Sequence, residues 1–133
     1  ATPQEIREFS PKRPVKLSKK LFLRNVRTAA KSSAPGLSGL RYEHTRSLLD
    51  DPDGQSFEAL FAVAQLLARG EVPEQTAKAI GLGRITALDK GEGKKNRVRG
   101  IVAGDVLRRL TAKTLAHNLA SKLKKYVRLS SLL

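Results

Sequence analysis

Most of the side chains that could take part in chemistry here are cations, and few are of the kinds that catalyse reactions alone. Cysteine is absent, and the two histidines, His44 and His117, lie far apart with no cluster of carboxylates beside either. These counts exclude disulfides, thiolate metal sites and cysteine nucleophiles, and they argue against a histidine-rich metal centre. Asp105 has the position of a helix cap rather than of a metal ligand. We expect no catalytic residue and no metal-binding residue within this chain.

A glycine- and lysine-rich loop, residues 90–96, is well suited to contacting phosphates. It is not a Walker loop, because Leu88 and Lys95 stand where that pattern requires a glycine and a Ser or Thr. Its cations remain available, since Lys94 and Lys95 lie in the loop and Arg97 follows it. We expect these three side chains to contact nucleic acid.

Charge is the strongest signal in the composition. The 133 residues carry a net charge of +14, from 26 Lys and Arg against 12 Asp and Glu. Residues 1–49 have eleven basic and three acidic side chains, residues 50–83 have two and six, and residues 84–133 have thirteen and three. Such an imbalance is self-repelling unless a polyanion binds, which favours a nucleic-acid partner. The alternative is a ribosome-like or merely solubilised surface. No apolar run approaches the roughly 18 residues of a membrane span, so we expect no membrane partner.

The elements that must position these cations begin with an arm and a helix. Three prolines among few large apolar residues predict a flexible basic arm over residues 1–15, followed by a single domain over residues 16–133. A helix is predicted over residues 16–31, in which five cations fall within an arc of about 80°. We expect this basic stripe to bind nucleic acid, with an ordinary solvated face as the alternative; its members are Lys16, Lys20, Arg24, Arg27 and Lys31.

The middle of the chain predicts a loop and three further helices. Residues 32–39 form the loop, in which Gly36 and Gly39 allow positive φ or a close approach of a ligand to the backbone. A helix then starts near position 38 or 39 and runs to about residue 49. Ser56 is expected to cap the next, which ends near residue 69 and is so apolar on all sides that we expect it to be buried. Pro73 is expected in the first turn of a short helix that ends near residue 80.

The last third predicts a hairpin and a long helix. Residues 84–89 and 97–103 are the expected strands, and alternation places Arg97 and Arg99 on one face of the second. Asp105 is expected to cap a helix that runs to about residue 127. Its apolar arc changes sides along its length, so the helix is either buried on two sides or bent. The predicted fold class is α+β, mostly helical, with one antiparallel β-hairpin followed by a long C-terminal helix.

Three segments of the chain, in order, resemble motifs of reverse transcriptases, and those of non-LTR retrotransposons above all. The first, residues 34–43, is similar to the family's Ala-Pro-Gly-x-Asp-Gly motif, which continues through a hydrophobic residue to a Glu; Ser38 replaces the Asp. The second, residues 70–73, is similar to a Gly-x-Val/Ile-Pro step. The third, residues 99–110, is similar to an Arg-Pro-Ile segment that leads through Gly-Asp/Glu into an Arg-Arg pair; Gly100 replaces the Pro.

The resemblance covers roughly residues 18–120 and implies a fingers-like region of an RNA-directed DNA polymerase. In that region a hairpin folds over the incoming nucleotide and N-terminal helices grip the template. The resemblance therefore implies that Lys90 and Arg99 bind the nucleotide triphosphate, and that Pro35, Gly36 and Gly39 form the motif loop. The family's metal-binding carboxylates lie in a palm domain, one pair in a Tyr/Phe-x-Asp-Asp turn that this sequence lacks.

We therefore expect a fingers portion that ends before the palm and is inactive alone. Its expected partners are an RNA template or RNA/DNA hybrid, a deoxynucleotide triphosphate and the missing palm domain. It binds no cofactor alone, and Mg²⁺ is expected for the complete enzyme. The expected location is intracellular and nuclear, where the family meets chromosomal DNA. The alternative is an autonomous basic RNA- or DNA-binding module with no enzymatic activity. With 5% aromatic residues it lacks a base-stacking platform and would bind the backbone.

Overall fold

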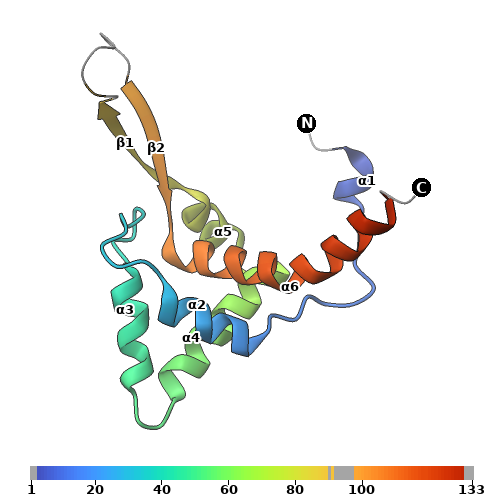
Figure 1. The fold of residues 1–133 in the computed structure, drawn as a ribbon, viewed down its shortest axis with the longest axis horizontal. Coiled ribbons are helices and arrows are strands. Elements are labelled where there is room, and N and C mark those ends of the chain that lie inside the picture. The colour runs from blue at the N-terminus through green and yellow to red at the C-terminus, as the bar shows by residue number, and fades with distance from the viewer. Residues whose placement is uncertain (1–2, 90, 92–97, 131–133) are drawn as a thin grey trace.

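The structure, a computed structural model, describes residues 3–89, 91 and 98–130. Within these ranges it is a mixed fold with six α-helices, one 3-10 helix and one two-stranded antiparallel hairpin, which confirms the coarse fold class (Figure 1). In chain order the elements are α1 (Gln4–Arg7), α2 (Lys19–Thr28), α3 (Tyr42–Ser47), η1 (Leu48–Asp50), α4 (Gln55–Arg69), α5 (Glu74–Gly81), β1 (Gly83–Asp89), β2 (Val98–Gly104) and α6 (Val106–Ser130).

The core lies where α2, α4 and the first half of α6 meet. Phe22 of α2 is fully buried, and its ring centroid lies 6.1 Å from that of Phe57 and 5.7 Å from that of Phe61. A buried polar contact joins two of these helices, because Asn25 Nδ2 donates to Thr114 Oγ1 at 3.0 Å. The buried apolar cluster consists of Leu17, Phe22, Val26, Phe57, Leu60, Ala64, Val106 and Leu110. We refer to this packed part of the molecule, from α2 to α5 with the first half of α6, as the body.

Helix α2 is shorter at both ends than the sequence predicted. Ser18 begins it, since its side chain accepts a hydrogen bond from the Leu21 N–H at 3.3 Å. Ala29 ends it with a backbone that has left the helical region, at φ −59° and ψ 139°. The predicted helix over residues 16–31 is therefore wrong at its ends, and Lys16 and Lys31 lie outside it.

The N-terminal arm contains a short helix that was not predicted from the sequence. Residues 3–16 are all exposed, but Gln4–Arg7 form the short helix α1. The arm attaches to the body at Leu17, whose side chain is buried and whose N–H donates to Gln65 Oε1 at 3.0 Å.

Two predicted helix starts were wrong for the same reason. In both places a nearby side chain accepts a hydrogen bond from a backbone N–H and so changes where the helix begins. Helix α3 begins at Tyr42 rather than near position 38, because Ser38 Oγ accepts from the Leu40 N–H and holds that segment as a turn. Ser56 does not cap α4; Gly54, with φ 69°, occupies that position. Asp51 instead accepts from both the N–H and the hydroxyl of Ser56, at 2.8 and 2.7 Å.

Helix α4 is not buried on all sides. It contributes Phe57, Leu60 and Ala64 to the core, whereas Val63 is 41% exposed and Leu66 is 43% exposed. The prediction of an all-round buried helix was therefore wrong, because α2 and α6 cover one side of α4 only.

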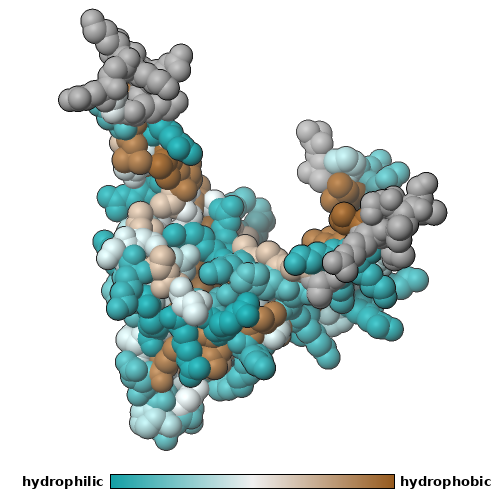
Figure 2. All heavy atoms as spheres, in the orientation of Figure 1, coloured by the Kyte–Doolittle hydropathy of each residue, from teal (hydrophilic) through white to brown (hydrophobic). Residues whose placement is uncertain are grey.

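The hairpin extends away from the body (Figure 1), and its register pairs Arg84 with Ala103 and Leu88 with Arg99. Opposite residues share a face, so one face carries Arg84, Thr86, Leu88, Arg99 and Ile101. The other face is apolar over most of its length, with Ile85, Ala87, Val98 and Val102. Both faces are exposed, and Figure 2 shows the apolar colour on the strands.

Helix α6 changes environment along its length. Asp105 caps it as predicted, with Oδ1 accepting from the Leu107 N–H at 2.9 Å. Val106, Leu110 and Thr114 are buried, whereas Leu119 and Leu123 further along are exposed. Of the second apolar arc, Leu115 still packs against the core but Leu119 and Leu123 do not, and the helix runs out beyond the body (Figure 1).

Candidate nucleic-acid interface

The cations of α2 lie on one exposed face of that helix. Lys20, Arg24 and Arg27 are spaced by four and three residues, which places them on the same side, and all three are exposed. The opposite side is held in the core by Phe22 and Val26. Packing therefore fixes which way the cations point, and we refer to these three residues as the cationic face of α2.

Few of the described cations are neutralised by carboxylates. Among the residues that the structure describes, ion pairs join Lys19 to Glu58 and Lys78 to Glu74, the latter at 2.7 Å. No member of the cationic face is in either pair. Arg24 instead donates to Nδ1 of His117 at 3.4 Å, so this ring nitrogen is the acceptor. The face keeps its charge available for an external anion.

The two outer members of the predicted stripe lie apart from this face. Lys16 precedes α2, and its carbonyl oxygen accepts from Asn118 Nδ2 at 3.0 Å. Lys31 follows α2 in the loop, and its side chain is exposed. Of the five predicted residues, the structure thus keeps three on one helix face.

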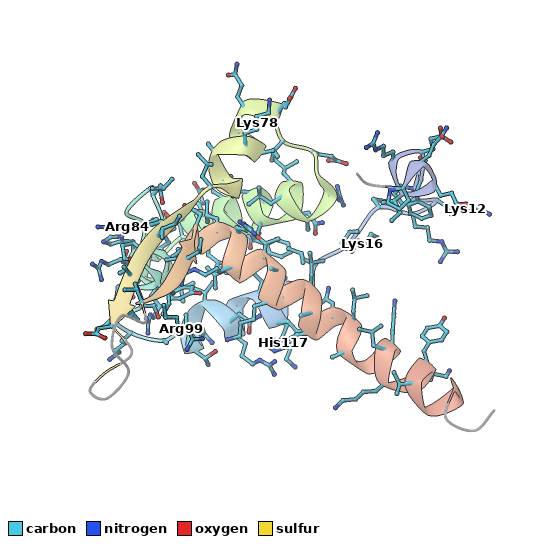
Figure 3. All side chains as sticks on the ribbon, turned by 90° about the horizontal axis from the view of Figure 1, so that it is seen from above. Lys12, Lys16, Lys78, Arg84, Arg99 and His117 are labelled. Atoms are coloured by element: carbon cyan, nitrogen blue, oxygen red, sulfur yellow. The ribbon has the colours of Figure 1, made fainter. Side chains whose placement is uncertain are left out.

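On the hairpin, the structure places Arg84 on the same face as the predicted site residue Arg99 but four register positions away, since Arg84 pairs with Ala103 and Arg99 pairs with Leu88. Both are exposed, and Figure 3 shows them on the two strands, well away from Lys12 and Lys16 at the arm. The sequence analysis missed Arg84, although strand alternation combined with the pairing of the two strands could have found it. The other predicted residues of the tip, Lys90, Lys94, Lys95 and Arg97, lie outside the described residues.

The glycine-bearing loop packs against the start of α6, and we refer to this contact as the junction. A Cβ added to Gly36 would lie 2.8 Å from the backbone nitrogen of Asp105, so only glycine fits. Gly39 has φ +74°, which also favours glycine. The positive φ expected for the loop is found at Gly39, whereas Gly36 lies close to the chain's own backbone and the expected approach of a ligand stays a prediction. Pro35 immediately precedes this contact.

Side chains tie the junction together from both segments. Ser38 Oγ donates to Asp105 Oδ2 at 2.6 Å, so both carboxylate oxygens of Asp105 are engaged. Arg109 Nη2 donates to the Ala34 carbonyl at 2.8 Å, and its guanidinium lies 4.9 Å from the centroid of the Tyr42 ring. The first and third segments of the reverse-transcriptase resemblance, far apart in sequence, therefore meet in one place.

The described residues do not fit the magnesium site of a complete polymerase. Across residues 3–89, 91 and 98–130, no group of three or more His, Asp or Glu could hold a metal ion. Asp105 is committed to Ser38 and to its own helix. In the same part of the chain, no helix is long and apolar enough to cross a membrane.

Beside the end of α2, a hollow of about 560 Å³ opens towards α3. Arg27, Lys31 and Arg46 line it together with Glu43 and Asp50. The Ser32 N–H, which donates to Glu43 Oε1 at 2.6 Å, is the main reason that the pKa of Glu43 is lowered; its own backbone N–H and the charges of Arg46 and Arg41 add to this. The sequence analysis missed Arg46, because only the packing of α3 beside α2 brings it near Arg27.

No protein-family model, no curated protein and no solved structure matches this chain. The cationic face of α2, the hairpin and the junction are the observations from which a function can be proposed.

Proposed function

We propose that this chain is the fingers portion of an RNA-directed DNA polymerase. The cationic face of α2 binds the backbone of a template or RNA/DNA hybrid. The face of the hairpin that carries Arg84 and Arg99 contacts the incoming deoxynucleotide triphosphate. The portion binds and positions, and it performs no bond-forming step, since its sequence has no Tyr/Phe-x-Asp-Asp turn. In this proposal the palm and its metal-binding carboxylates lie outside residues 1–133.

The observation that carries the proposal is the junction. Two of the segments that resemble reverse-transcriptase motifs contact each other through Gly36, Ser38, Asp105 and Arg109. Motif residues that belong to one fold are expected to make mutual contacts, whereas chance matches have no reason to converge. The junction also lies where β2 ends and α6 begins, so it supports the base of the hairpin that carries Arg99.

Charge supports the nucleic-acid part of the proposal independently. The side chains of Lys20, Arg24 and Arg27 are exposed on α2, and none of them has a carboxylate partner among the described residues. Cations at this spacing replace the counterions of a phosphate backbone and give binding that weakens steeply with salt. A merely solubilised surface has no need to keep three such cations on one rigid face.

A second candidate function is an autonomous basic module that binds RNA or DNA without catalysis. It is favoured by the cationic face, which is complete within this chain. Both candidates predict backbone binding, and they differ in what accompanies the chain. The gene sequence downstream of Leu133 separates them: an Asp-bearing hydrophobic strand followed by a Tyr/Phe-x-Asp-Asp turn supports the polymerase, and a stop codon supports the module.

The shared nucleic-acid function is tested with the full chain by fluorescence anisotropy on a labelled RNA/DNA hybrid at several salt concentrations. Combined replacement of Lys20, Arg24 and Arg27 by Ala is expected to lower the slope of log K against log salt by about two to three, since each phosphate contact contributes about 0.7 to 0.9.

A matched control removes the same charge from the end of α6, by replacing Lys122, Lys124 and Lys125 with Ala. We expect this variant to keep most of the slope, because these lysines are exposed and follow the buried part of α6, whose last buried residue among those described is Thr114. Equal losses in the two variants would mean that the chain binds through net charge alone. Absence of binding by the unaltered chain at moderate salt would refute both candidate functions.

A further inference from the structure

The hollow beside α2 and α3 brings together cations that are distant in sequence. Arg27 comes from the last turn of α2, Lys31 from the loop that follows, and Arg46 from the last turn of α3. At about 560 Å³, the hollow is within the size range of pockets that hold small ligands, and it is far larger than a single water requires.

The three cations share the hollow with two carboxylates, and the charge of Arg46 helps to lower the pKa of Glu43. In the part of the chain that the structure describes, none of the three forms an ion pair within 4.0 Å or a side-chain hydrogen bond. The Nη2 atom of Arg46 is buried and has no acceptor. Buried donors are normally satisfied, and this nitrogen has no acceptor among the described residues, so an external acceptor would satisfy it.

The carboxylates of the hollow are Glu43 and Asp50. The N–H of Ser32 donates to Oε1 of Glu43 at 2.6 Å, whereas Oε2 of Glu43 is buried and accepts no hydrogen bond from the described residues. Three cations against two carboxylates leave the hollow with a formal charge of +1. A monoanionic group with several acceptor oxygens matches both this charge and the side-chain N–H groups that have no acceptor. Arginine is the side chain best suited to contact two such oxygens at once.

We propose that this hollow is a phosphate pocket, in which Arg27, Lys31 and Arg46 hold one backbone phosphate of the nucleic acid that runs along α2. The inference rests on the proposed nucleic-acid function and deepens it. Arg27 belongs to both the cationic face and the hollow, so a strand that follows Lys20, Arg24 and Arg27 is led directly into the pocket. Arg46 is the residue whose role is new, since it lies outside α2.

The test measures how each single variant of the full chain changes the salt dependence of binding to the same labelled hybrid. Arg46→Ala is expected to lower the slope of log K against log salt by about one, the value of one lost phosphate contact, for any base sequence. Arg46→Lys keeps the charge and is expected to keep most of the slope. Arg41→Ala is the matched control, because Arg41 is an exposed cation just before α3 that does not line the hollow.

The outcomes separate this inference from the function on which it rests. If the chain binds and the triple variant of α2 loses slope while Arg46→Ala behaves like Arg41→Ala, the pocket is refuted and the proposed function stands. If the unaltered chain does not bind, the proposed function fails first. Circular dichroism of each variant shows whether the helices persist, and Lys31→Ala, on a loop, provides a second variant that leaves helix packing intact.

A free phosphate is the other source of the same chemistry, and inorganic phosphate is its probe. At constant ionic strength, we expect phosphate in the millimolar range to leave the melting temperature of the chain unchanged, because one anion without a strand is held weakly. A rise in melting temperature that Arg46→Ala abolishes would assign the hollow to free phosphates and overturn the backbone proposal.

Discussion

The body and the hairpin of this chain both contain large apolar residues, which are buried in the body and exposed in the hairpin. In the body, Phe22 is 0% exposed, whereas in the hairpin Ile85 is 75% exposed. The body closes three helices around its aromatic side chains. The hairpin has two strands that contact each other and leave both faces to solvent. A two-stranded ribbon of this kind is marginal in water on its own.

The difference in burial shows that the body is held by contacts within the chain, whereas most of the hairpin is not. Burial and the Asn25–Thr114 hydrogen bond hold the body and thereby the cationic face of α2. The hairpin is held at its base, where β2 runs into α6, and among the described residues no third strand joins its sheet. A rigid grip and an exposed ribbon fit the proposed division, in which α2 holds the backbone and the hairpin meets a smaller ligand.

The largest expected effect comes from emptying the centre of the body. Phe22→Ala removes a fully buried ring that contacts Phe57 and Phe61, and such truncations cost about 3–5 kcal/mol. We expect a large fall in the urea midpoint of unfolding, or loss of folding altogether. The measurement is chemical denaturation followed by circular dichroism.

The matched change in the hairpin is Ile85→Ala, which removes an exposed apolar side chain. It is expected to shift the free energy of unfolding by no more than about 0.5 kcal/mol, because the side chain already lies in solvent. Similar losses in the two variants would show that something in the chain covers the hairpin, and the contrast between the two regions would be wrong.

A smaller effect is expected at the junction, where the body meets the base of the hairpin. Gly36→Ala places a Cβ 2.8 Å from Asp105 N and 2.9 Å from Asp105 Cα, both of them backbone atoms that no rotamer change can move. Overpacking of this kind costs about 1–3 kcal/mol. We expect a lower unfolding midpoint, measured by the same denaturation.

Gly81→Ala is the control for Gly36→Ala. Gly81 has no atom within 4 Å of its added Cβ and ends α5, so the substitution is expected to be neutral or slightly stabilising. If Gly36→Ala were equally harmless, the loop would be free to move away from α6. The junction would then no longer support the proposed function.

The elements that could be predicted from the sequence are those that local chemistry decides. The glycine- and lysine-rich loop of residues 90–96, between two segments of alternating polarity, predicted the hairpin. Asp105 predicted the start of α6, because Asp is a common helix cap. The cationic face was found because helical periodicity needs only neighbouring residues. In the same way, Gly36 and Gly39 were correctly marked as positions with a special backbone requirement.

The starts of α3 and α4 were wrong because of nearby side chains, whereas the other errors arose where a distant residue decided the outcome. Gln65 holds the N–H of Leu17 from α4, and Ser18 then begins α2 later than the charge stripe suggested. The exposed side of α4 depends on how many helices cover it, which periodicity does not reveal. Arg46 joined Arg27 only through the packing of α3, so no spacing in the sequence pointed to the hollow.

The smallest expected effect lies at the edge of the body, in the turn before α4. Asp51 accepts from the hydroxyl and the N–H of Ser56 and from the N–H of Asp53, and these hydrogen bonds lower its pKa. A lowered pKa in the folded state means that the charged form stabilises the fold. This stabilisation is complete above the ordinary pKa of Asp, about 3.9, and is lost as the pH falls through the lowered value.

Asp51→Asn is therefore expected to lower the urea midpoint modestly at pH 6 and to differ less from the unaltered chain as the pH approaches 3. Asp53→Asn is the control, because it removes the same charge from the same turn, and the Asp53 side chain makes no hydrogen bond with any described residue. A constant difference between Asp51→Asn and the unaltered chain over this range would show that the Asp51 carboxylate acts by shape rather than by charge. The start of α4 would then be held by Gly54 and by packing alone, and the stability of the body would owe nothing to this turn's ionisation.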